Sequence, residues 1–284
     1  MKPALPFLVL ALCAAIAIPA PARAADPAPV VLPSSADAAA LDAVIGGSWR
    51  GPANTARDKY RHPKQTLQFF GVRPDQSLIE ITPGGGWYTE ILAPLLRAKG
   101  HYFGIIEDPD SVKPSARNET EDQNTQYEAK LAMRPDLYAL TQVRSIDPNA
   151  PVLGPNASAD VVLTFRNVHN WVMGNRQAAM FKAIYAVLKP GGILGVVDHR
   201  ANPGPATDGM KGYLTEQQVI DYATAAGFKL EAKSEINANP KDGKDWPRGV
   251  WTLPPTVALG AADKAKYQAI GESDRMTLRF VKPK

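Results

Sequence analysis

The order of apolar runs after Ser77 constrains the fold of this chain more than any other feature of its sequence. Short runs rich in β-branched residues alternate with segments of helical periodicity, a pattern typical of a parallel sheet joined by crossover helices. The strand-like runs are at 77–82, 101–107, 139–144, 160–165 and 192–197. The helical segments between them are at 88–98, 120–133 and 176–188.

The alternation ends after the fifth run, and the remaining pattern predicts one helix and two strands. The helix is expected at 215–226, with Thr215 as its N-cap. The strands are expected at 228–236 and 276–281, and since no long helix separates them they should form an antiparallel hairpin. We therefore expect an α/β fold of the Rossmann-like type, with a mostly parallel sheet, an antiparallel C-terminal hairpin and helices on both faces.

Prolines dominate the long segment 237–272 between the last two strands. It contains Asn239-Pro240, Trp246-Pro247 and Pro254-Pro255, so we expect mostly extended loop with one short helix near 261–270. A loop of this length either covers a site as a lid or decorates the surface.

The first 24 residues have the pattern of a secretory signal peptide. A lysine at position 2 precedes the apolar stretch 5–18, and Ala22-Arg23-Ala24 forms a small-x-small cleavage site. Cleavage after Ala24 would leave 260 of the 284 residues and remove Cys13, the only cysteine. We therefore expect a periplasmic or secreted protein without disulfides. No membrane span is expected, because the apolar stretch is short and no later one approaches about 18 apolar residues.

Three further segments are expected after the cleavage site. Residues 25–36 are rich in proline and alanine and are predicted to be a disordered linker. Residues 37–284 are predicted to form one domain, with a helical extension at 37–76 and a core at 77–284. Within the extension, helices are expected at 37–44 and 54–70.

The charge balance argues against nucleic acid as a partner. Lys2 and Arg23 leave with the signal peptide, so 30 lysines and arginines remain against 28 acidic residues, and the formal net charge falls from +4 to +2. A nucleic-acid-binding domain normally has a strong basic excess.

The segment 78–89 predicts a ligand-binding turn between a buried strand and a helix. Glycines at 84–86 permit positive φ angles and leave the backbone bare, so a ligand can reach the N–H groups at the start of the helix. A dinucleotide fingerprint would need glycine or alanine at position 89, where the chain has Thr89, and no Gly-Lys-Ser/Thr follows as in a P-loop. A nicotinamide oxidoreductase remains a third alternative.

The same segment resembles the first motif of the class I S-adenosylmethionine-dependent methyltransferases, in which an acid and then glycines end a strand and open a helix. Glu80 corresponds to the acid, and Gly84 and Gly86 to the second and third glycines. Thr82-Pro83 stands where the family usually has glycine and a small residue. The resemblance extends over roughly 77–282 and includes the phrase Leu188-Lys-Pro-Gly-Gly and the closing hairpin. More narrowly, Phe165-Arg-Asn-Val-His-Asn-Trp resembles a phrase in exported proteins described as predicted methyltransferases.

The resemblance implies S-adenosylmethionine as the cofactor. Glu107, at the end of the second strand, is the candidate for the ribose hydroxyls, with Asp108 as the fallback, and Glu80 is the candidate for the ligand's ammonium group. Each acid has an alternative role, since the first two can cap a turn and the third can cap the next helix. The other candidate cofactor-binding residues are Thr82, Gly84, Gly85, Gly86 and Asn167.

Methyl transfer from a sulfonium depends mainly on positioning, but an oxygen or nitrogen acceptor must still lose a proton. A histidine suits that task because it ordinarily titrates close to neutral pH. His169, just beyond the fourth strand, is our first choice as general base, and Asp198 and His199, beyond the fifth strand, are the other catalytic candidates. A solvated or backbone-bonded histidine is the alternative. These residues lack the tight spacing of a metal-binding motif, so no metal is expected.

Two further groups of residues have competing interpretations. Arg57, Arg61 and His62 either select an anionic acceptor or lie on a solvated helix face. Trp87 and Trp171 either line the pocket or pack in the core. The resemblance thus predicts an exported methyltransferase acting on a small-molecule or surface-associated acceptor. The alternative is a non-catalytic periplasmic binding protein with the same fold, which Thr82-Pro83 and the cytoplasmic origin of S-adenosylmethionine favour.

Overall fold

The computed structural model describes Met1 and residues 34–284. Residues 2–24 of the predicted signal peptide and residues 25–33 of the predicted linker lie outside the described residues. The end of the predicted linker is wrong, because helix α1 (Ser35–Ile45) already begins there. Ser34 and Asp37 form a capping box in which each side chain accepts a hydrogen bond from the other residue's backbone N–H, and this fixes the first turn of the helix.

The predicted single helix at 54–70 is also wrong. The chain instead forms three short helices, α2 (Pro52–Thr55), α3 (Asp58–Arg61) and α4 (Pro63–Phe69). His62 between α3 and α4 has a left-handed φ of 41°, and the following proline can begin a helix but cannot continue one. This break separates the residues of α3 from the helix that packs against the sheet.

The described chain contains a seven-stranded sheet with the order β3-β2-β1-β4-β5-β7-β6. The strands are β1 (Ser77–Ile81), β2 (His101–Glu107), β3 (Gln142–Ile146), β4 (Ala159–Phe165), β5 (Leu188–His199), β6 (Lys229–Ser234) and β7 (Arg275–Val281). The first five pair in parallel, and β7 pairs antiparallel with both β5 and β6. The predicted fold class is confirmed. The last strand of the chain, and not β6, pairs with the parallel part of the sheet.

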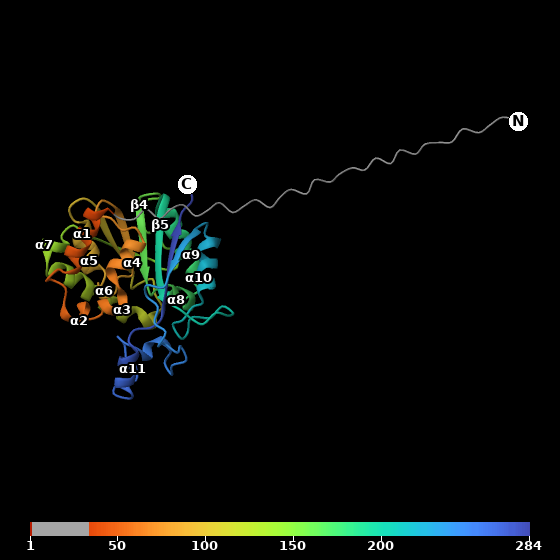
Figure 1. Cartoon of the computed structure of the whole chain (residues 1–284). Helices are drawn as coiled ribbons and strands as arrows, with labels where there is room; N and C mark the ends of the chain where they lie inside the picture. The colour runs from red at the N-terminus through yellow and green to blue at the C-terminus, as the bar shows by residue number, and fades with distance from the viewer. Residues whose placement is uncertain (2–33) are drawn as a thin grey trace.

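Helices cover both faces of this sheet (Figure 1). Helices α1, α4 and α5 lie on one side, and α8, α9 and α10 on the other. The remaining bounds are α5 (Thr89–Leu96), α6 (Arg117–Ala132), α7 (Pro135–Tyr138), α8 (Val168–Met173), α9 (Gln177–Val187), α10 (Glu216–Ala225) and α11 (Lys264–Ile270), with 3₁₀ turns η1 (Pro114–Ala116) and η2 (Gly249–Thr252). Among the described residues, none of the helices combines the length and the apolar character that crossing a bilayer requires.

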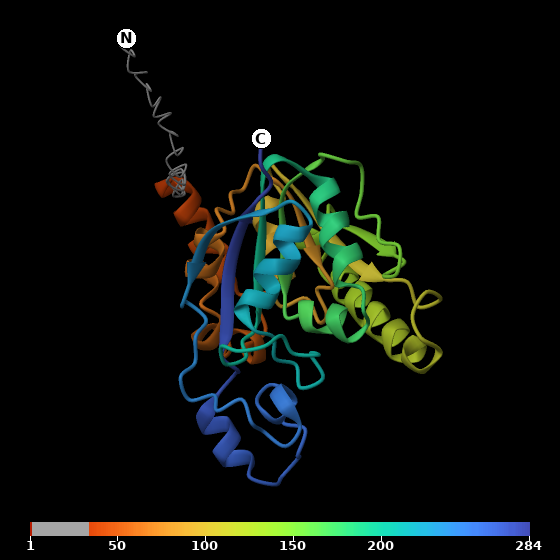
Figure 2. The ribbon, with the colours of Figure 1, turned by 90° about the vertical axis from the view of Figure 1, so that its right-hand side faces the viewer.

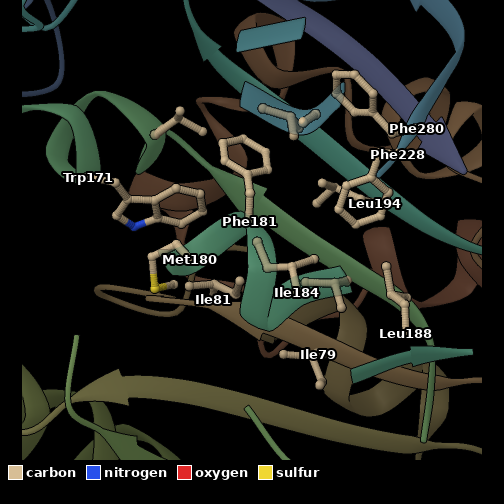
Figure 3. Packing of buried hydrophobic residues seen from close by; sticks show 14 of the residues in the cluster. Ile79, Ile81, Trp171, Met180, Phe181, Ile184, Leu188, Leu194, Phe228 and Phe280 are labelled. Carbon is tan, nitrogen blue, oxygen red and sulfur yellow. The ribbon is translucent and has the colours of Figure 1, made fainter. Parts of the chain in front are cut away.

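Two hydrophobic cores hold the layers together. Side chains alternate along a strand, so Leu78 of β1 packs into the core under α5 while Ile79 packs into the core under α9. Figure 3 shows the second core around Phe181 and Ile184 of α9. Because both faces of β1 are buried, its carboxyl end is the only part of the strand free to meet a ligand.

The segment between β6 and β7 lies beyond the edge of the sheet at which β5 ends (Figures 1 and 2). The predicted short helix in this segment is confirmed as α11. Val250, Trp251 and Thr256 of the segment line a cavity at this edge. The segment therefore forms one wall of a site.

Candidate functional site

Two adjoining cavities lie at the carboxyl ends of the parallel strands, where open α/β sheets place their ligands. The first, of about 330 Å³, is lined by His169 and His199 and is called the histidine cavity below. The second, of about 540 Å³, is lined by Glu107 at the end of β2 and is called the β2 cavity. The lining residues that both cavities share are Thr82, Gln123, Asn167 and Asn170.

The turn after β1 forms the boundary between the cavities. Thr82 has a φ of 47°, a left-handed conformation that a β-branched residue rarely adopts. Its backbone N–H donates to the Ile105 carbonyl at 2.8 Å, which holds the strained residue in place. Thr82 thus takes the conformation that a glycine would adopt easily, at a cost of about 1–2 kcal/mol.

The three glycines of the turn have different surroundings. A Cβ atom on Gly84 or Gly85 would meet nothing within 4 Å, and both residues line the histidine cavity. A Cβ atom on Gly86 would lie 3.3 Å from the Tyr127 ring, and Gly86 lines neither cavity. Two of the predicted glycines therefore present bare backbone to open space, while the third allows α6 to pack closely.

Glu80 is buried beside this turn. It accepts hydrogen bonds from the hydroxyls of Tyr102, at 2.5 Å, and Thr89, at 3.3 Å. Burial raises its pKa to about 7, although both hydrogen bonds oppose the shift. It lines the histidine cavity, and its two hydrogen-bond donors are side-chain hydroxyls and not the first backbone N–H groups of α5. Glu80 is therefore an acid whose ionised form a cationic ligand group would stabilise.

The two acids after β2 have separate roles. Glu107 lines the β2 cavity, where Arg176 donates to its Oε1 at 3.2 Å. Asp108 lines neither cavity and caps a turn, accepting from the Asp110 N–H and the Ser111 hydroxyl, each at 3.0 Å. Of the two candidates for a ribose, only Glu107 reaches a cavity.

Asn167 joins the ends of two neighbouring strands. Its side-chain amide donates to the Ile81 carbonyl at 2.8 Å and to the Thr164 hydroxyl at 3.2 Å. The residue lines both cavities, so it shapes the turn after β4 and also faces the ligand space.

His169 lies on α8, a helix that the sequence did not predict. Its Nδ1 is 2.9 Å from Oδ1 of Asp198, and its backbone N–H donates to Oδ2 of the same residue at 3.2 Å. Asp198 is fully buried, and the carboxylate favours the tautomer with hydrogen on Nδ1, which leaves the Nε2 lone pair of His169 as a proton acceptor. The solvated alternative for His169 is wrong, because only 3% of the residue is exposed.

His199 packs beside His169 with ring centroids 5.1 Å apart. Its Nδ1 is 2.5 Å from the Ser273 hydroxyl oxygen. Burial, and then the neighbouring positive charges, lower the pKa of His199 well below its usual value, so its ring is neutral at neutral pH.

His169, Asp198 and His199 offer three possible metal-ligand atoms within 4.8 Å of one another. The oxygens of Asp198 already accept from the ring and backbone of His169 and from the backbone N–H of His199 at 2.7 Å. These hydrogen bonds hold the Asp198 carboxylate against His169 and orient the His169 ring as a base.

Four arginines surround one carboxylate at the histidine end of the site. Arg57, Arg61 and Arg275 donate to Glu272 at 2.7, 3.1 and 2.9 Å. Burial alone would raise the pKa of Glu272, but these arginines and Arg166 lower it to about 2. The solvated-face alternative is wrong for Arg61, which is 2% exposed.

The remaining predicted residues divide between wall and core. His62 lines neither cavity. Trp87 lines the histidine cavity under the Arg61 guanidinium, which lies 4.7 Å from its ring. Trp171 packs in the core against Phe181 and also borders the β2 cavity. Trp251, which was not predicted, lies with its ring centroid 6.1 Å from that of His169.

Several residues of the site had no assigned role in the sequence. Glu272 is the last residue of the long proline-rich segment, and Ser273 follows it. Arg166 follows β4 and has a left-handed φ of 64°. Arg275 reaches the site because β7 pairs with β5, which places it opposite His199. Only the pairing of β7 with β5 reveals this neighbour.

Comparisons with known proteins agree with this architecture at the level of the fold. No protein-family model matches the sequence, and no curated protein matches it either. A S-adenosylmethionine-dependent methyltransferase from Aquifex aeolicus has a similar structure, with a TM-score of 0.54 and 14% identity over 87% of this chain and 98% of that chain. The [4+2]-cyclase SpnF is similar as well, with a TM-score of 0.55 and 18% identity over 84% of this chain and 85% of that chain. The chain therefore has the fold of these proteins, and a fold alone does not assign a reaction.

Proposed function

We propose that this protein is an exported S-adenosylmethionine-dependent methyltransferase that acts on a small acceptor. One observation carries the proposal: two cavities meet at the glycine turn, one beside Glu107 and the other beside the His169–Asp198 pair. A transferase needs two binding spaces that adjoin at the reacting atoms.

The residues present fit the cofactor. Open space beside Gly84 and Gly85 leaves their backbone free to meet the amino acid portion, and Glu80 lies at the same end to accept its ammonium group. Glu107 at the rim of the β2 cavity is placed for the ribose hydroxyls. Thr82 and Asn167, which line both cavities, would contact the ligand where it passes from one to the other.

The chemistry then divides between the ligand and the chain. When bound, S-adenosylmethionine supplies a methyl group whose bond to sulfur breaks with both electrons remaining on sulfur, while a lone pair of the acceptor forms the new bond. His169 takes the acceptor's proton on Nε2, and Asp198 stabilises the imidazolium that results. Trp251 and the neighbouring segment exclude water from this step.

Calorimetry tests the cofactor directly. Purified protein should bind S-adenosylmethionine and its demethylated product, S-adenosylhomocysteine, in a saturable manner. Absence of heat with either ligand at about 1 mM would contradict the proposal. Substitution of Gly84 by valine should abolish binding, because the side chain would enter the open space beside the turn.

The alternative is a non-catalytic binding protein with the same fold. Thr82-Pro83 in the turn favours it, because the family usually has glycine and a small residue there. Release of S-adenosylhomocysteine in the presence of small hydroxyl- or amine-bearing compounds distinguishes the two. Tight binding of the cofactor without release of the product over such a panel would favour the alternative.

Export is part of the proposal and has its own test. The signal-peptide pattern at 1–24 predicts that the processed protein begins at Ala25. Cell fractionation and N-terminal sequencing should recover that form outside the cytoplasm. An intact N-terminus in the cytoplasmic fraction would contradict export.

A further inference from the structure

We propose that the arginine cluster of the histidine cavity binds a compact dianion, a phosphate or a dicarboxylate group carried by the methyl acceptor. The inference rests on the proposed function for its link to methyl transfer. The cluster consists of Arg57, Arg61, Arg166 and Arg275 around Glu272. Three observations support the inference: the charge of the cluster, its burial and its unpaired donors.

The cluster has more positive than negative charge. Among the described residues, Glu272 is the only carboxylate that hydrogen-bonds these arginines, and Asp198 is close enough to act on Arg166. Glu80 lies near Arg61, but its pKa of about 7 leaves it neutral at lower pH. With Glu80 neutral, four guanidinium groups against Glu272 and Asp198 leave two positive charges. Buried charges of one sign are costly unless a ligand balances them, and a dianion supplies the missing two.

Donors of the cluster are left without partners. Glu272 engages Nε of both Arg57 and Arg61, while Nη2 of each is buried and forms no hydrogen bond with the described residues. Both arginines line the cavity, and the Arg61 side chain is only 3% exposed. Guanidinium forks match the paired oxygens of phosphate and carboxylate groups, so these donors point to an oxyanion.

The position of the cluster assigns this anion to the acceptor. Glu272 is followed by Ser273, whose hydroxyl lies 2.5 Å from Nδ1 of His199, so the arginines are joined to the histidine pair through adjacent residues. After burial and His169, the positive charges of Arg166, Arg275 and Arg61 lower the pKa of His199. The anion therefore lies beside the catalytic histidines.

The size and shape of the space limit the acceptor further. A volume of about 330 Å³ is at the lower end of small-molecule sites, which run from roughly 300 to 1,000 Å³. The rings of Tyr88 and Phe165 stack with their centroids 3.6 Å apart, and together with Trp251 they form aromatic walls of the cavity. The expected acceptor is a small molecule with the dianion at one end and a hydroxyl or amine directed at His169.

Calorimetric titration with inorganic phosphate and with malonate tests the site without any turnover. At least one of the two anions should bind with a stoichiometry of one anion per protein. The anion that binds more tightly identifies the charged group of the acceptor as a phosphate or a dicarboxylate. Arg166→Gln should weaken that binding at least tenfold. Arg57→Gln, at a side chain that is 22% exposed, should do the same and serves if the first variant does not fold. Arg134→Gln is the matched control, because it removes one exposed arginine that pairs with Asp136 and should leave the affinity unchanged.

Repeating the titration with saturating S-adenosylhomocysteine separates this inference from the proposed function. The anion should bind equally well, because it occupies the arginine end of the histidine cavity, while the amino acid portion of the cofactor lies at the end formed by Gly84, Gly85 and Glu80. Competition between the two would overturn the inference, since the arginines would then hold the carboxylate of the cofactor. Failure of both anions to bind at about 10 mM would also overturn it, while cofactor binding in the same experiment would leave the proposed function standing. Anion binding without cofactor binding would support the anion site and contradict the proposed function.

Discussion

Oδ1 of Asp198 lies 2.9 Å from Nδ1 of His169, and the same carboxylate receives the backbone N–H of the histidine. Two contacts from one buried acid determine both the tautomer and the direction of the ring. The acid comes from the end of β5 and the histidine from the helix after β4, so the pairing of these adjacent strands assembles the base.

Removal of this base should slow methyl transfer without changing cofactor affinity. We expect His169→Ala to lower the rate of S-adenosylhomocysteine release by roughly 100- to 10,000-fold, and Asp198→Asn to lower it as well, because the amide no longer favours hydrogen on Nδ1. The rate is measured with whichever compound of the panel is methylated, and affinity by calorimetry. His101→Ala, at an exposed histidine on β2, is the control. Full activity of the alanine variant would remove His169 from the mechanism.

The raised pKa of Glu80 should make stability depend on pH. Its pKa rises from an ordinary 4.5 to about 7 on folding, so its favourable contribution is complete below pH 4.5 and is lost as pH rises through 7. The cost above pH 7 is on the order of 3 kcal/mol. Glu80→Gln should match the wild type in urea unfolding at pH 4.5 and exceed it at pH 8. If the free energy of unfolding varied with pH in the same way for the two proteins, the pKa of Glu80 would not be raised on folding.

The same group should make cofactor affinity depend on pH. A cationic ammonium group near Glu80 favours the ionised carboxylate, so binding releases a proton below pH 7 and affinity for S-adenosylhomocysteine rises as pH approaches 7. Calorimetry in buffers of different ionisation enthalpy measures the released proton. In Glu80→Gln the proton release should disappear, and its persistence would place the ammonium elsewhere.

Gly85→Val should block the cofactor without backbone strain. Gly84 has a φ of 56°, so any side chain there combines blockage with strain, whereas Gly85 is not among the residues with positive φ. A Cβ atom on Gly85 meets nothing within 4 Å, so a valine would extend into the cavity. We expect at least tenfold weaker binding of S-adenosylhomocysteine and an almost unchanged melting temperature. Gly51→Val, at a position that is equally open and lines neither cavity, should retain affinity.

Periodicity predicted that the strands exist, because buried parallel strands are apolar runs bounded by turn residues. It placed the third strand at 139–144, whereas β3 is Gln142–Ile146. It failed where local signals conflict with packing. The Lys189-Pro190-Gly191-Gly192 stretch follows the end of α9, as its proline and glycines predict, but strand β5 already begins at Leu188 and not at position 192. Helix α8 has only six residues and no side-chain cap, so His169 appeared to lie on a loop.

The site was predictable only where its residues lie at or just beyond the ends of strands. Glu107, Asp198 and His169 belong to that class, because parallel strands end at one edge. Asp198 and His199 were expected beyond the fifth strand, but they are the last two residues of β5. The arginine cluster does not, since Arg61 and Glu272 are 211 positions apart and meet through the pairing of β7 with β5. No local pattern contains that information.

Glu272 should contribute strongly to the stability of the folded protein, because it is the carboxylate that the arginine cluster surrounds. Its pKa is lowered from 4.5 to about 2, so its stabilising contribution is present above pH 4.5 and is lost as pH falls through 2. Glu272→Gln removes that contribution at neutral pH and leaves the arginines uncompensated, so the free energy of unfolding should fall by about 3–5 kcal/mol. Thermal and urea unfolding measure the loss.

Phosphate should restore part of that stability if the cluster binds anions. At 100 times its dissociation constant, a ligand that binds only the folded state adds about 2.7 kcal/mol, and the vacated Nε donors of Arg57 and Arg61 should make the variant respond more strongly than the wild type. Glu231→Gln is the matched control, because it breaks the partly buried pair with Arg279 at a site that lines neither cavity. Its stability should respond to phosphate no more than the wild type does. An equal response in both variants would mean that phosphate acts through general salt effects and not through the cluster.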